Sequence, residues 1–142
     1  MRNALKAGTV YFFLVFAAGF AFGTLRTLFI APVIGDLIAV ALELPLMLAI
    51  SWIACRWVLQ RIRVPNLTYH RIVMGASAFI LLMVAEVLMS TQLASRDLAS
   101  HFALYRTLPV FIGLLGQIAF ALFPLFQTAD QTARSVWEGK RP

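Results

Sequence analysis

The chain has 142 residues, of which 61% are hydrophobic and 13% are charged, and its mean hydropathy is +0.86. A soluble domain of this length could not bury so much apolar surface, so the composition excludes that class and indicates an integral membrane protein. The single Cys55 excludes an internal disulfide, and His70 and His101 are expected on opposite sides of the membrane. No metal site and no other cofactor is therefore expected.

Hydrophobic runs of about 20 residues, the length that crosses a bilayer, leave room for four spans and no separate soluble domain. The predicted fold is an all-α integral membrane bundle in one domain, residues 1–142, with transmembrane helices at about 8–30, 36–59, 70–93 and 108–128. Between the last two spans, Leu98, Phe102 and Tyr105 recur at helical spacing in a more polar segment. This spacing predicts a short interfacial helix.

The first apolar run follows a short basic leader, MRNALK, and is longer than the roughly 7 to 15 residues of a signal-peptide core, so we expect a retained span. Gly19 and Gly23 form a GxxxG pattern, and Arg26 lies three residues further along the same helical stripe. Small residues at this spacing let another backbone approach. Two interpretations remain open: tight packing within the bundle, or dimerisation.

Pro32 and Gly35 interrupt the apolar pattern and predict a tight turn, after which Asp36 is expected to cap the second span. Glu43 follows two helical turns later. Pro45 removes the amide that would bond the Ala41 carbonyl, which predicts a kink with a free acceptor beside the Glu43 carboxylate.

The basic residues predict the orientation of the chain. Residues 55–71 mix arginines with Trp57 and Tyr69, a pattern typical of a cytoplasmic membrane anchor, so no nucleic-acid partner is expected. With four spans, nine basic residues fall on one side and only Arg96 and Arg106 on the other. This asymmetry predicts that both termini are cytoplasmic. The nine are Arg2, Lys6, Arg56, Arg61, Arg63, Arg71, Arg134, Lys140 and Arg141.

Three intramembrane charges form the main candidate site. Counting residues from the span ends places Arg26, Glu43 and Glu86 roughly 6 to 15 Å below the outer surface, with Gln117 slightly deeper. An Arg at the centre of a membrane helix costs about 2.5 to 3.5 kcal/mol on insertion scales, so Arg26 is expected to bond Glu43 or Glu86. The cluster is interpreted either as a polar clasp that fixes helix register or as a site where two carboxylates share a proton.

The stretch GFAFGTLRTLFIAPVIGDLIAVALELPLMLAISW resembles a pattern in uncharacterised small four-span bacterial inner-membrane proteins, where Gly-Thr-x-Arg precedes a Pro and Gly turn and a Glu-x-Pro. The resemblance covers roughly the first 60 residues. It implies a bacterial inner-membrane location and a paired role for Arg26, Glu43 and Pro45, but no activity.

No catalytic or nucleotide-binding motif is present, so an enzyme is not expected. The favoured function is an accessory or structural component that packs against another membrane protein or a second copy of itself. The alternative is a small oligomeric transporter or proton-linked permeation unit that uses Arg26, Glu43 and Glu86. A cluster open to water would favour the transporter.

Overall fold

The computed structural model describes residues 1–92 and 97–138, except for the side chains of residues 101 and 128–138, and every regular element in these ranges is helical. Four helices are long and apolar enough to cross a membrane. The prediction of an all-α bundle with four spans is confirmed. The spans are Arg2–Ile34, Asp36–Ile62, Thr68–Gln92 and Leu108–Gln127.

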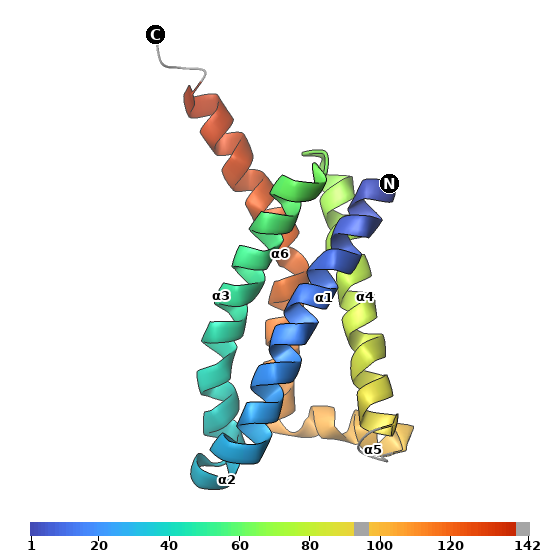
Figure 1. Ribbon diagram of the computed structural model, residues 1–142, viewed down its shortest axis with the longest axis vertical. Coiled ribbons are helices and arrows are strands. Elements are labelled where there is room, and N and C mark those ends of the chain that lie inside the picture. The colour runs from blue at the N-terminus through green and yellow to red at the C-terminus, as the bar shows by residue number, and fades with distance from the viewer. Residues whose placement is uncertain (93–96, 139–142) are drawn as a thin grey trace.

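The four long helices form a ring in the order α1, α3, α6, α4. Helix α1 (Arg2–Leu25) packs against α3 (Asp36–Ile62) and α4 (Thr68–Gln92), and α6 (Leu108–Glu138) packs against the same two helices. Figure 1 shows the N-terminus and the α3–α4 connection at one end, called here the N-terminal end. The short helices α2 (Ala31–Ile34) and α5 (Leu98–Ala103) lie at the opposite end, called here the α2–α5 end.

The hydrophobic core is concentrated in the half of the bundle near the N-terminal end. There Gly8 of α1 lies against Ser77 of α4, and Gly75 of α4 lies against the Ala121 backbone of α6. The absence of side chains at these glycines lets the helices approach closely, so this half is packed tightly. The residues of the core cluster are Ala4, Ala7, Tyr11, Phe12, Val15, Cys55, Val58, Leu59, Val64, Met74, Ala78, Leu82 and Phe120.

The turn after the first span differs from the prediction, because Pro32 does not end the helix. Instead α1 continues into a π-helical turn, η1 (Arg26–Ile30), in which the Ala31 amide bonds the Arg26 carbonyl, and then into α2. The wider π turn gives the chain room for the proline ring, and Pro32 stands in the first turn of α2, where an amide is not needed. Gly35 alone makes the reversal, with a φ of 85° that glycine adopts freely.

The start of α3 is corrected: its N-cap is Gly35, and Asp36 is the first helical residue, without a side-chain capping bond. The fourth span ends at Gln127, close to the predicted residue 128, and helix α6 continues beyond it to Glu138. The expected short helix between the third and fourth spans is present as α5, followed by a 3-10 turn, η2 (Leu104–Arg106). Figure 1 shows this segment crossing the end of the bundle.

Candidate functional site

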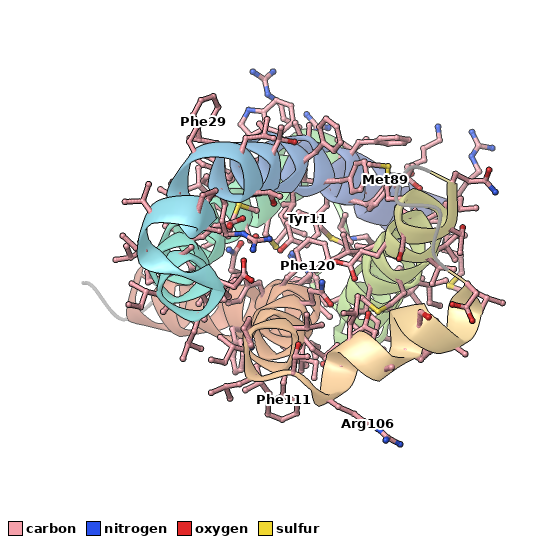
Figure 2. The ribbon with its side chains drawn as sticks, turned by 90° about the horizontal axis from the view of Figure 1, so that it is seen from below. Tyr11, Phe29, Met89, Arg106, Phe111 and Phe120 are labelled. Atoms are coloured by element: carbon pink, nitrogen blue, oxygen red, sulfur yellow. The ribbon has the colours of Figure 1, made fainter. Side chains whose placement is uncertain are left out.

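A cavity of about 940 Å³ lies between the four long helices in the half near the α2–α5 end. Figure 2 views the bundle from this end and shows the helices arranged around a central space. Most of the wall is apolar, but each long helix, together with the π turn η1 and the 3-10 turn η2, contributes polar groups. The polar lining residues are Thr24, Arg26, Thr27, Asp36, Glu43, Ser51, Glu86, Tyr105, Thr107 and Gln117.

The cavity ends at an aromatic stack near the middle of the bundle. The rings of Tyr11 and Phe120 stack with centroids 4.3 Å apart and an interplanar angle of 22°. The Tyr11 hydroxyl donates a hydrogen bond of 3.1 Å to the Phe120 carbonyl oxygen. Both residues are buried, and Figure 2 shows them at the centre of the ring. This stack closes the cavity toward the N-terminal end because the tightly packed core begins behind it.

One wall of the cavity holds an ion pair. Arg26, at the start of the π turn, places Nε 2.6 Å from Oε2 of Glu43 on α3, and the two side chains are 27% and 18% exposed. The predicted bond between Arg26 and one of the two glutamates is therefore confirmed, with Glu43 as the partner. Because both side chains also line the cavity, the pair is not sealed in a dry core.

Glu86 has a different set of partners on the opposite wall. Gln117 donates a hydrogen bond from Nε2 to Oε1 of Glu86, and the Tyr105 hydroxyl donates one of 3.3 Å to Oε2. Burial and the adjacent Glu86 carboxylate raise the pKa of Tyr105 to about 12, so its phenol keeps its proton at neutral pH and remains a donor. The contacts of Glu86 described here are thus with neutral groups, while Arg26 is engaged by Glu43.

The GxxxG pair lies on the cavity wall instead of in a close helix contact. A Cβ on Gly23 would meet no atom within 4 Å, and one on Gly19 would meet only the Met47 side chain, at 3.4 Å. Tight packing within the bundle, one of the two interpretations of this pair, is instead provided by Gly8 and Gly75. The other interpretation, dimerisation through Gly19 and Gly23, stays a prediction.

Pro45 does not place a free acceptor beside the Glu43 carboxylate. Helix α3 continues through Pro45, which is exposed, as is Ala41, whereas Glu43 lines the cavity. Two residues turn a helix by about 200°, so the carbonyl freed by the proline lies on the face opposite Glu43.

Sequence reasoning missed several structural roles. The sequence pattern places Tyr105 only in the interfacial helix, and it gives Tyr11 no role within the first span. The pattern also predicts Arg71 as part of the membrane anchor, but Arg71 is only 2% exposed, inside the packed half. Arg96, Lys140 and Arg141 lie outside the described residues, and Arg134 lies where side chains are not described.

The described part of the chain holds no group of three or more His, Cys, Asp or Glu residues placed to bind a metal ion. Comparison of the chain with protein families, with curated proteins and with solved structures gave no match.

Proposed function

We propose that this chain is a non-enzymatic protein of the bacterial inner membrane that binds a small molecule in its cavity, acting as a small oligomeric transporter unit. In this proposal both termini are cytoplasmic, so the α2–α5 end and the half of the bundle that holds the cavity face outward. The basic residues Arg2, Lys6, Arg56, Arg61 and Arg63 at the N-terminal end support this orientation.

The observation that carries the proposal is the position of the polar cluster on the wall of a cavity of about 940 Å³. Small-molecule sites have volumes of roughly 300 to 1,000 Å³, with mostly apolar walls and a few convergent polar groups. A purely structural clasp would be expected to lie where the helices pack tightly. Here the packed half of the bundle lies beyond the Tyr11–Phe120 stack, and the charged residues line the hollow half.

An accessory component is the second candidate, and one observation favours it. Gly19 and Gly23 leave a strip of wall without side chains, and a Cβ on Gly23 would meet open space. A helix of another membrane protein could pack along such a strip. In that case the cavity would be filled by the partner in the native membrane and would open when the chain is purified.

Thiol labelling tests the proposed function. Gly113 lines the cavity, and a Cβ added there meets no atom within 4 Å, so the position has room for the cysteine of Gly113→Cys. A membrane-impermeant methanethiosulfonate added outside intact cells is expected to label Gly113→Cys. The wild type is the unlabelled control, because its only cysteine, Cys55, is fully buried.

Asn66→Cys, in the α3–α4 connection, reports the orientation and should react only after the cells are opened. Labelling of Asn66→Cys from outside would reverse the proposed topology. Gly113→Cys that stays unreactive in cells and in the purified chain would contradict an open cavity. Reaction only after purification would favour the accessory function.

A further inference from the structure

We propose that the ligand of this cavity is an organic cation: an amine or quaternary ammonium group carried on an apolar body. This inference depends on the proposed function, since it names the class of molecule that the open cavity would bind. Three features carry it: the balance of charges on the wall, the aromatic surface and the unequal partners of the two glutamates.

Besides the Tyr105 phenol, the ionisable lining residues that the structure describes are three acids, Asp36, Glu43 and Glu86, and one base, Arg26. Glu43 engages Arg26, so the remaining two acids face the cavity without a matching cation among the lining residues. Arg106, the nearby base of η2, is exposed, and Figure 2 shows it pointing away from the ring of helices. A cleft with excess negative charge and low-dielectric walls concentrates cations and repels anions.

The Glu86 carboxyl group is held in place by two neutral side chains. Gln117 and Tyr105 donate hydrogen bonds to its two oxygens, and neither donor carries a positive charge. A cationic ligand would therefore gain an ion pair at Glu86 in surroundings where charges are weakly screened. An anionic ligand would have to compete with Glu43 for Arg26.

The rest of the wall suits an apolar body. Aromatic rings from two helices, those of Phe16, Phe20 and Phe120, line the cavity together with aliphatic side chains. A cation within about 6 Å of an aromatic ring is attracted by its quadrupole, most strongly when it has lost its water. The wall therefore offers an apolar surface for the body of the ligand, and its aromatic rings favour a positive charge, as the acids do.

The inference is tested by comparing how fast Gly113→Cys reacts with a cationic and with an anionic thiol reagent. Residue 113 is suitable because it lies one helical turn from Gln117, which donates a hydrogen bond to Glu86. The reagents are a cationic methanethiosulfonate, with a trimethylammonium group, and an anionic one, with a sulfonate group. Their rates are divided by their rates with 2-mercaptoethanol in solution. We expect the cationic reagent to react at least about tenfold faster, the lower range for electrostatic focusing.

Glu86→Gln keeps the shape of the side chain and should lower that ratio severalfold at Gly113→Cys. Benzyltrimethylammonium should also protect Gly113→Cys from a neutral reagent, methyl methanethiosulfonate, whereas benzenesulfonate, of similar size, should not. Equal rates for the two charges, or protection by the anion, would overturn the organic-cation proposal while leaving an open cavity intact. If no reagent labels Gly113→Cys, the open cavity itself is contradicted. If Glu86→Gln does not fold, the rate ratio and the protection measured with Gly113→Cys alone still show whether the cavity favours cations.

Discussion

Gly75→Ala is expected to lower the free energy of unfolding by about 1 to 3 kcal/mol, the usual cost of overpacking a tight contact. The added Cβ would overlap the carbonyl oxygen of Ala121, which belongs to the backbone of α6 and cannot rotate away as a side chain could. Helices α4 and α6 would have to separate in the half that holds the core. Thermal unfolding of the purified chain in mild detergent measures the effect.

Gly23→Ala is the matched control for this prediction. It makes the same chemical change on another membrane-spanning helix, where the new Cβ meets no atom within 4 Å. Because Ala favours a helix over Gly by about 1 kcal/mol, the control should unfold at the wild-type temperature or above it. Equal unfolding temperatures for Gly75→Ala and Gly23→Ala would contradict the assignment of the packed half.

Arg26→Ala is the second change with a large expected effect, since it leaves the Glu43 carboxylate without its partner at the cavity wall. Breaking a fully buried pair costs about 3 to 5 kcal/mol. The cost here should fall below that range, because the two side chains are 27% and 18% exposed and water can enter. Glu43→Gln should cost less than Arg26→Ala, because the amide keeps the shape of the side chain and its oxygen can still accept a hydrogen bond from the Arg26 guanidinium.

A double-mutant cycle checks whether the two residues act together. The double variant Arg26→Ala with Glu43→Gln should lose less stability than the two single variants summed, because the partners are coupled. Combining Arg26→Ala with Glu86→Gln should give losses closer to additive, since the contacts of Glu86 described here are with Gln117 and Tyr105. Additive losses for Arg26 and Glu43 would contradict the ion pair.

The fold class and the ion pair between Arg26 and Glu43 could be predicted from the sequence, because both depend on strong physical constraints. Apolar runs of about 20 residues have few alternatives to a membrane helix. A charge inside such a run needs a partner, and residue counting placed Arg26 and Glu43 at similar depths. Helical rise and the cost of burying a charge are the same however the helices pack.

The rest of the site depends on tertiary packing that the pattern of residues does not encode. Tyr105 reaches Glu86 because α5 and η2 cross the end of the bundle from α4 to α6 (Figure 1), and Tyr11 meets Phe120 across more than one hundred residues of sequence. Gly8 and Gly75 make the close contacts, whereas the GxxxG motif at Gly19 and Gly23 faces the cavity. A small-residue pattern predicts that the helix surface has room beside it. The pattern does not show whether another helix or a cavity occupies that room.

Spin-label contact with heavy water tests whether the half of the bundle near the α2–α5 end holds a water-filled cavity. Labels at Gly113→Cys, on the cavity wall, and at Leu115→Cys, half-exposed on the outer surface of the same helix, are compared in deuterated buffer after reconstitution in lipid. We predict strong deuterium modulation of the electron spin echo at residue 113 and weak modulation at residue 115. Weak modulation at both positions would contradict the cavity and the function proposed for it.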